Sequence, residues 1–145
     1  MSANTPKESY RFSHKIKVRY HEVDMQQIVF NANYLTYLGM AWIEYLRNLG
    51  LHYSELSKNN EFDTVIAKAS MSFMRPARYD EVLEIHVQVK KLGTKSIPVT
   101  FLVCREDSAE VVLDGEIVYV AYDTEKEVSS AIPEFVAERI RKFEK

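Results

Sequence analysis

The sequence predicts an α+β fold in which one long central helix is wrapped by a five-stranded, largely antiparallel sheet and is followed by a short C-terminal helix. Apolar residues recur at three- and four-residue steps over residues 31–50, which is the period of a helix with a wide apolar stripe. In five other segments apolar residues alternate with polar ones or run continuously, as they do in strands. Short turns separate the later strands, so neighbouring strands should run antiparallel.

The first strand and the long helix follow from their own patterns. Over residues 12–20 apolar and polar side chains alternate, which predicts a half-buried strand. The helix over residues 31–50 can be capped by Asn31 or Asn33, and Gly50 suits the left-handed position at its end. We expect the apolar stripe of this helix to form the centre of the core: Tyr34, Leu35, Leu38, Trp42, Tyr45, Leu46 and Leu49.

Four more strands are predicted after the helix, over residues 64–73, 83–90, 95–104 and 111–122. The last two are apolar on both faces and should lie in the middle of the sheet. Pro98 cannot donate a hydrogen bond to a neighbouring strand, which favours an edge position or a bulge there. Pro133 opens the terminal helix. The inner side of that helix should hold Phe135, Val136, Ile140 and Phe143.

Length and composition are typical of one globular domain. Of the 145 residues, 46% are hydrophobic and 28% charged, so we expect a loosely ordered N-terminus over residues 1–11 and a single domain over residues 12–145. The net charge of −2 argues against nucleic-acid binding, and no apolar run approaches the ~18 residues of a membrane span. Because Cys104 is the only cysteine, an internal disulfide and a Cys-based zinc site are excluded. We expect a cytoplasmic protein without metal or cofactor.

The segment between the first strand and the helix carries the most informative chemistry. Asp24 lies seven residues before Asn31, at the expected start of the helix. A helix start has unpaired N–H groups and a partial positive charge, which can stabilise a carbonyl oxygen as it becomes negative under attack. A nearby carboxylate can attack that carbonyl or activate a water molecule. The pattern therefore suggests a hydrolytic site, with a purely structural Asp24 that caps its loop as the alternative.

Four motifs follow one another along nearly the whole chain, over residues 24–37, 75–83, 92–96 and 132–133. Together they resemble the 4-hydroxybenzoyl-CoA thioesterase family of hotdog-fold proteins, and most closely its branch with the Tol–Pal-associated acyl-CoA thioesterases. The resemblance implies an acyl-CoA thioesterase in which Asp24 is the catalytic aspartate and the backbone amide at Asn31 polarises the thioester carbonyl. It also implies that Thr94, Lys95 and Ser96 contact the phosphates of coenzyme A.

Some residues depart from the family pattern or compete with it. The family usually has glycine three residues after the aspartate, where this chain has Gln27. It often has an acidic residue where Gly39 stands, so this chain lacks that second acid and has space for an acyl chain there. Arg75, Arg78 and Lys91 are equally reasonable phosphate ligands on charge alone.

The resemblance also implies partners and leaves other functions open. The expected substrate is acyl-CoA or an acyl carrier protein. Exposed sheet edges favour at least a dimer. The resemblance implies a homodimer or a homotetramer, with the site at a subunit boundary. A non-catalytic acyl-thioester-binding module is the alternative suggested by Gln27 and Gly39. A hydratase or dehydratase would need a histidine base, for which His21 is the candidate beside Asp24.

Overall fold

A computed structural model describes residues 6–145 of the chain. Its helices are α1 (Asn33–Asn48), α2 (Tyr53–Lys58) and α3 (Glu134–Glu144), with short 3-10 helices at Lys7–Ser9 and Tyr20–Glu22. Its strands are β1 (Phe12–Lys17), β2 (Thr64–Phe73), β3 (Val82–Val89), β4 (Ser96–Arg105), β5 (Val111–Asp123) and β6 (Val128–Ser129). Residues 1–5 of the expected loose N-terminus lie outside the described residues. Within residues 6–145, no helix is both long and apolar enough to cross a bilayer.

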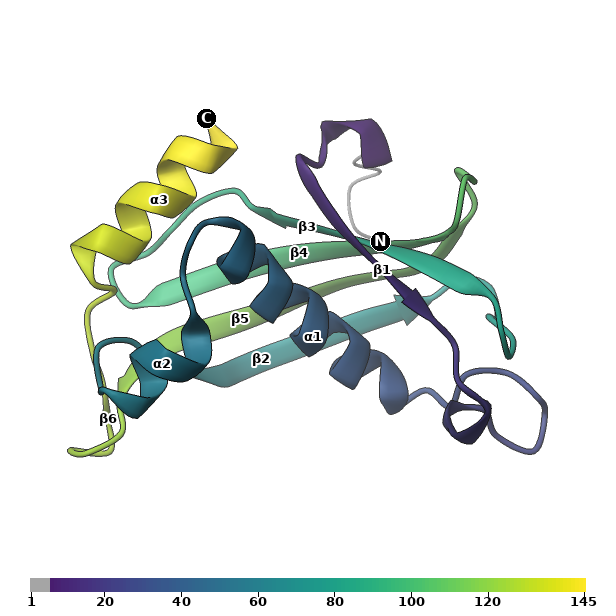
Figure 1. The fold of residues 1–145 in the computed structure, drawn as a ribbon, viewed down its shortest axis with the longest axis horizontal. Coiled ribbons are helices and arrows are strands. Elements are labelled where there is room, and N and C mark those ends of the chain that lie inside the picture. Colours follow the sequence, from purple (N-terminus) through teal and green to yellow (C-terminus); the bar gives the residue numbers. More distant parts are fainter. Residues whose placement is uncertain (1–5) are drawn as a thin grey trace.

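The sheet curls around α1, which lies against its inner face (Figure 1). The strand order is β1-β3-β4-β5-β2, all neighbours are antiparallel, and the two-residue β6 pairs with the end of β5. The predicted α+β class and the antiparallel sheet around one long helix are therefore confirmed. β4 and β5 lie inside the sheet as predicted, whereas β1 and β2 form its two edges.

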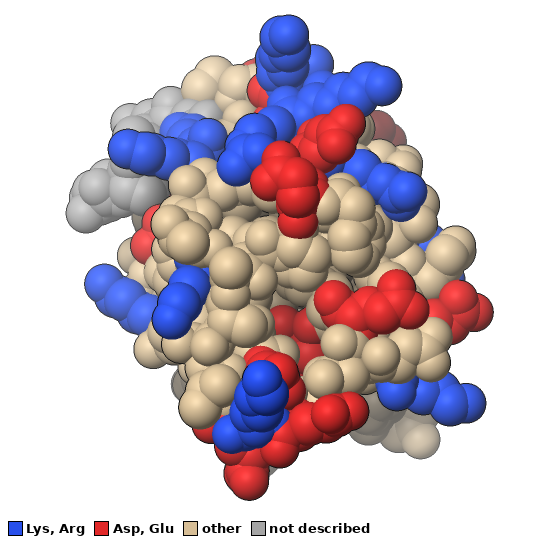
Figure 2. Space-filling model, turned by 90° about the vertical axis from the view of Figure 1, so that its left-hand side faces the viewer, with Lys and Arg blue, Asp and Glu red and all other residues tan. Residues whose placement is uncertain are grey.

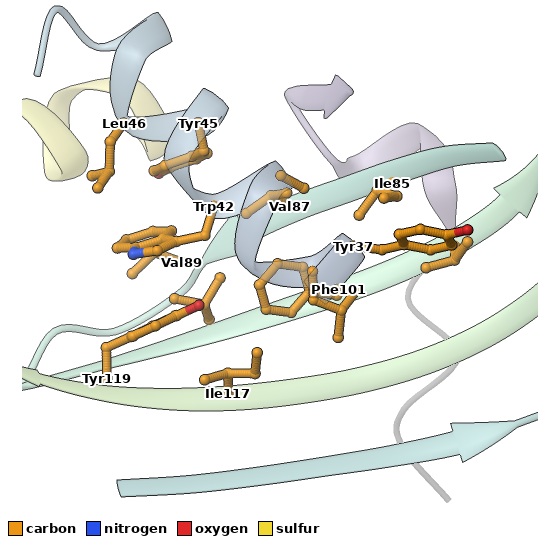
Figure 3. Close-up of a cluster of buried hydrophobic side chains, with 14 of the residues drawn as sticks. Tyr37, Trp42, Tyr45, Leu46, Ile85, Val87, Val89, Phe101, Ile117 and Tyr119 are labelled. Atoms are coloured by element: carbon orange, nitrogen blue, oxygen red, sulfur yellow. The ribbon is translucent and has the colours of Figure 1, made fainter. Parts of the chain in front are cut away.

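An aromatic stack lies at the centre of the core (Figure 3). Trp42 of α1 is 2% exposed and lies between the rings of Tyr45 and Tyr119, with centroid distances of 5.4 and 5.0 Å. Phe12 of β1 and Phe143 of α3 meet the Tyr45 ring edge-on, at 5.7 and 5.6 Å. Residues from β1, α1, β5 and α3 thus share one contact, which holds the helix in a single position on the sheet.

Two partly buried hydrogen bonds hold α3 against the rest of the domain. Glu144 Oε2 accepts hydrogen bonds from the Tyr45 hydroxyl at 2.7 Å and from the backbone N–H of Val89 at 2.9 Å. Val136 and Ile140 are buried as predicted and Phe143 is partly buried. The prediction for Phe135 is wrong, because its position on α3 leaves it 39% exposed.

The start of α1 differs from the sequence prediction. The helix begins at Asn33, its N-cap residue is Ala32, and no side chain caps it, so the predicted capping by Asn31 or Asn33 is wrong. Asn33 Nδ2 instead donates to the carbonyl oxygen of Glu22 at 2.9 Å, because the preceding loop folds back against the first turn. Gly50 takes φ +79° at the other end, as predicted.

Pro98 was expected at an edge or a bulge, and this holds locally: β4 lies inside the sheet, but its β3 side is open at Pro98. Pro98 lies in β4 opposite Val118 of β5, and the register of that pairing shifts only near Cys104. The proline is tolerated because the β3 ladder stops at Val89, opposite Val99. Beyond that pair, the β3 side of β4 has no hydrogen-bond ladder for Pro98 to interrupt.

Replacing Trp42 with alanine should lower the free energy of unfolding by about 3–5 kcal/mol, because it empties the space between Tyr45 and Tyr119. Urea unfolding followed by circular dichroism measures this. Phe135→Ala, an exposed aromatic on α3, is the matched control and should change it by less than about 1 kcal/mol. Equal effects of the two substitutions would contradict the central role of Trp42.

Candidate active site

Asp24 lies at the beginning of a tight turn in the loop before α1. Its backbone N–H donates to the carbonyl of Ile28, and its own carbonyl accepts from Gln27, both at 2.9 Å. Asp24 Oδ1 accepts the backbone N–H of Gln26 at 2.8 Å, so the structural role considered for Asp24 is present. The other carboxylate oxygen has no hydrogen-bond partner within residues 6–145, and the residue is half-buried. Asp24 can therefore cap the turn and still offer one oxygen to a ligand.

Gln27 adopts a left-handed backbone conformation, with φ +66°. Glycine takes this conformation freely, whereas a residue with a Cβ atom loses roughly 1–2 kcal/mol in it. This left-handed conformation explains why the family pattern has glycine at this position. The turn keeps its tight geometry in this chain despite the substitution, with the strain held at Gln27.

The loop returns alongside its own beginning and delivers the start of α1 next to Asp24. Val23 pairs with Val29, and the Phe30 N–H donates to the Glu22 carbonyl at 2.9 Å. Glu22, which accepts the bond from Phe30, is two residues before Asp24, or about 7 Å along an extended chain. The backbone N–H groups of Asn31 and Ala32 have no acceptor in the described part of the chain. An acid and free helix-start donors therefore lie on the two neighbouring strands of one loop.

Glu22 is the residue that fastens this loop to the helix. Its carboxylate accepts the backbone N–H of Arg19 at 2.8 Å, the Arg19 guanidinium at 2.7 and 3.1 Å, and the Tyr37 hydroxyl at 2.8 Å. Its backbone carbonyl accepts from Phe30 and from the Asn33 side chain. The residue is 5% exposed and its bond to Tyr37 is buried, whereas the Arg19 side chain is 57% exposed.

Burial and hydrogen bonding act on the Glu22 pKa in opposite directions. Burial raises it, but the hydrogen bonds from Arg19 and Tyr37 outweigh burial and hold the pKa below its ordinary value. The Tyr37 pKa is raised, because burial and the bond to a carboxylate both disfavour its anion. At neutral pH the pair is therefore a carboxylate and a neutral phenol, with the phenol as donor. Sequence patterns gave no signal for this pair, since fifteen residues separate Glu22 from Tyr37.

Arg75 lies at the same end of the molecule as Asp24. The segment after β2 runs beside the loop, where the Val29 N–H donates to Ala77 and Ile28 pairs with Arg78. The Arg75 guanidinium lies 3.5 Å from Glu110, at 61% side-chain exposure. The guanidinium of Arg78 has no acceptor within the described residues, so it is the less engaged of the two cations.

Thr94, Lys95 and Ser96 lie at the opposite end. The carbonyl of Lys95 accepts the N–H of Ala121, whereas the Arg75 N–H bonds to Val112 at the other end of β5. Nine residues of strand separate Val112 from Ala121, or roughly 30 Å. The structure therefore brings Asp24, Asn31 and Arg75 together and keeps residues 94–96 apart from them in one protomer.

The end of the molecule with residues 94–96 also carries α3, and Figure 2 shows it with Lys and Arg gathered mainly over its upper part. Lys91 and Lys95 are exposed in the β3–β4 connection, and Lys142 is exposed on α3. Lys95 Nζ donates to Ser129 Oγ at 3.3 Å. Figure 2 also shows Asp and Glu over the lower part of this end, so only the upper part has the positive charge that suits phosphate groups. Across residues 6–145, no three His, Cys, Asp or Glu side chains group closely enough to hold a metal ion.

Comparison with known proteins agrees with this architecture. The profile of the thioesterase-like superfamily matches residues 18–140. A protein of Aquifex aeolicus (strain VF5), provisionally named an esterase, is 31% identical over 98 residues, which cover 68% of this chain and 76% of that protein. The long-chain acyl-CoA thioesterase FadM of Escherichia coli (strain K12) is 28% identical over 131 residues, covering 90% of this chain and 98% of FadM.

A solved structure confirms the fold as well. The crystal structure of a hypothetical protein from Aquifex aeolicus superimposes with a TM-score of 0.82 at 27% identity, covering 89% of this chain and 98% of that one. The chain therefore belongs to the thioesterase-like superfamily, and it is a hotdog-fold thioester hydrolase, as the sequence resemblance predicted.

Glu22→Gln should lower the free energy of unfolding by about 1–3 kcal/mol at neutral pH, because it removes the charge that Arg19 and Tyr37 bind. Folding lowers the Glu22 pKa, so its stabilisation is fully present above pH about 4.5 and is lost as pH falls through the lower folded-state pKa. The gap between wild type and variant, measured by urea unfolding at several pH values, should therefore shrink in acid.

The control is Glu44→Gln, which removes a surface ion pair with Arg47 (3.3 Å) and should change stability by less than about 0.5 kcal/mol. A Glu22→Gln effect that stayed constant down to pH 3 would contradict the assignment of a bound carboxylate.

Proposed function

We propose that the protein hydrolyses acyl-CoA thioesters, with Asp24 as nucleophile or general base and the backbone N–H at Asn31 as oxyanion donor. The observation that carries this proposal is the adjacency of a carboxylate oxygen without a partner and the unpaired N–H groups at the start of α1. As the thioester carbonyl becomes tetrahedral, its oxygen becomes negative and is stabilised by those N–H groups and by the helix dipole. The name of FadM, a long-chain acyl-CoA thioesterase, supports an acyl-CoA substrate.

We further propose that the working unit is at least a dimer paired through β2. This strand has a neighbour only on its β5 side, and it leaves Val65, Ile66 and Phe73 41%, 49% and 52% exposed. The edge position leaves most of this strand exposed. A β2 strand from a second chain would pair with the open backbone N–H and C=O groups of this edge and cover these side chains.

Such a dimer would also complete the site. In an antiparallel pair about a two-fold axis, the first residues of one β2 lie opposite the last residues of the other. The first residue, Thr64, pairs with Ala121 beside Lys95, and the last residue, Phe73, comes shortly before Arg75. Residues 94–96 of one copy would then approach Asp24 of the other. Coenzyme A phosphates would contact this basic end, with Arg75 and Arg78 as further ligands.

Asp24→Asn should lower kcat for acyl-CoA hydrolysis by about 10²–10⁴-fold, because the amide can still accept from Gln26 but can neither attack nor take a proton. Thiol release from a panel of acyl-CoA substrates measures kcat. The control is Asp80→Asn, a surface carboxylate 3.6 Å from Lys17, which should leave kcat unchanged. Full activity of Asp24→Asn would end the assignment, and saturable binding without hydrolysis by the wild type would favour the non-catalytic module.

Ile66→Lys should convert the dimer to a 16.9 kDa monomer with loss of hydrolysis, because it places a charge on the paired edge. Light scattering after size-exclusion chromatography gives the mass. Val128→Lys on β6 is matched in exposure, at 51% against 49%, and should leave both mass and activity intact. A wild-type mass of one chain, or an unchanged mass for Ile66→Lys, would contradict pairing through β2.

A further inference from the structure

Gly39 occupies a position in α1 where the protomer itself does not require glycine. Among the described residues, Gly50 is the glycine with positive φ, so Gly39 has ordinary helical backbone. Apart from its chain neighbours and the nearby backbone of its own helix, no atom lies within 4 Å of the place that a Cβ atom would take. Because glycine weakens a helix interior relative to alanine, this position keeps an empty space at the expense of helix stability.

This space lies on the side of α1 that continues from the active site. Residues four apart form one row along a helix, and Leu35, Gly39 and Ile43 form such a row, with Asn31 two residues before the helix begins. Leu35 is 38% exposed despite its apolar side chain. Ile43 lines a small cavity together with Leu51 and Tyr53, where the row ends. Gly39 is eight residues from Asn31, or about 12 Å along the helix axis.

The row faces the β2 side of the sheet. Tyr37 points toward the loop after β1, where its hydroxyl meets Glu22. Gly39, two residues further on, is rotated by about 200° and faces the other way. Figure 1 shows β1 and β2 on opposite sides of α1, so the side away from β1 is the β2 side. On that side the exposed ring of Phe73 lies 5.8 Å from Tyr34 in the first turn of α1. Apolar surface therefore extends from the helix start toward Gly39.

We propose that Gly39 is a specificity-determining residue, whose missing side chain makes room for an extended, straight-chain acyl group lying along the Leu35–Gly39–Ile43 row. This inference rests on the proposed acyl-CoA hydrolysis, which places the carbonyl carbon at the helix start. Each bond of an extended chain advances about 1.3 Å, so an acyl group of roughly nine or more carbons reaches Gly39. Shorter acyl groups end before it and do not depend on the space.

The test is the acyl-length profile of Gly39→Leu, measured as kcat/KM over straight-chain CoA thioesters from acetyl to palmitoyl. For chains longer than about nine carbons, kcat/KM should fall about 10–100-fold, whereas chains of about six carbons or fewer should change less than about threefold. Gly39→Ala should raise Tm by about 2–4 °C, because nothing in the free protein blocks the added methyl group.

Asn48→Leu is the matched control, since it adds leucine at an exposed position at the far end of the same helix and should leave the profile unchanged. A uniform loss over all chain lengths with Gly39→Leu, an unchanged profile, or a changed oligomeric mass would overturn the inference. A uniform loss with a changed mass would assign the space to a second copy of the chain.

Wild-type activity separates a failure of the proposed hydrolysis from a failure of the inference about Gly39. If it turns over none of these thioesters, the same series is measured as non-hydrolysable thioether analogues by calorimetry. Gly39→Leu should then raise Kd about 10–100-fold for long chains alone. Equal Kd values for wild type and variant at every length would overturn the inference without reference to turnover.

Discussion

The apolar stripe of α1 lies along the concave face of a sheet that curls around it, and Trp42 between Tyr45 and Tyr119 is the centre of that contact. This burial determines where the polar groups of the helix can act. A helix of 16 residues that is covered along one side can present unpaired backbone groups only at its two ends. The first turn therefore emerges at one end of the sheet, and the active-site loop is formed there.

A buried carboxylate then sets the geometry of that loop. Removing Glu22 from water is unfavourable unless donors replace its hydration, and Arg19 and Tyr37 supply them from the strand end and from the helix. Because every one of these bonds has a defined direction, the loop has one position relative to the first turn of α1. In the proposed reaction, this would orient Asp24 and the helix-start N–H groups before any substrate arrives, which lowers the entropy that a reaction must lose.

On the β2 side, the same fold leaves apolar side chains exposed and a position on α1 unfilled. β2 is an edge strand with exposed apolar side chains, and α1 faces it with an unfilled position at Gly39. The basic end with residues 94–96 lies a full strand length from Asp24 in the same protomer. The proposed second chain and extended substrate would together account for these features, because each would cover apolar surface that one protomer exposes.

Periodicity in the sequence was enough to predict the strands, the long helix, the antiparallel sheet and the left-handed Gly50, because each depends on neighbours along the chain. The Asp24 loop was also recognisable, since its turn is local. Only the tertiary structure shows that no side chain caps α1, why Pro98 is tolerated in β4, and that Glu22 pairs with Tyr37. These depend on which distant segments lie side by side, as does the separation of Asp24 from residues 94–96, and no local pattern records that.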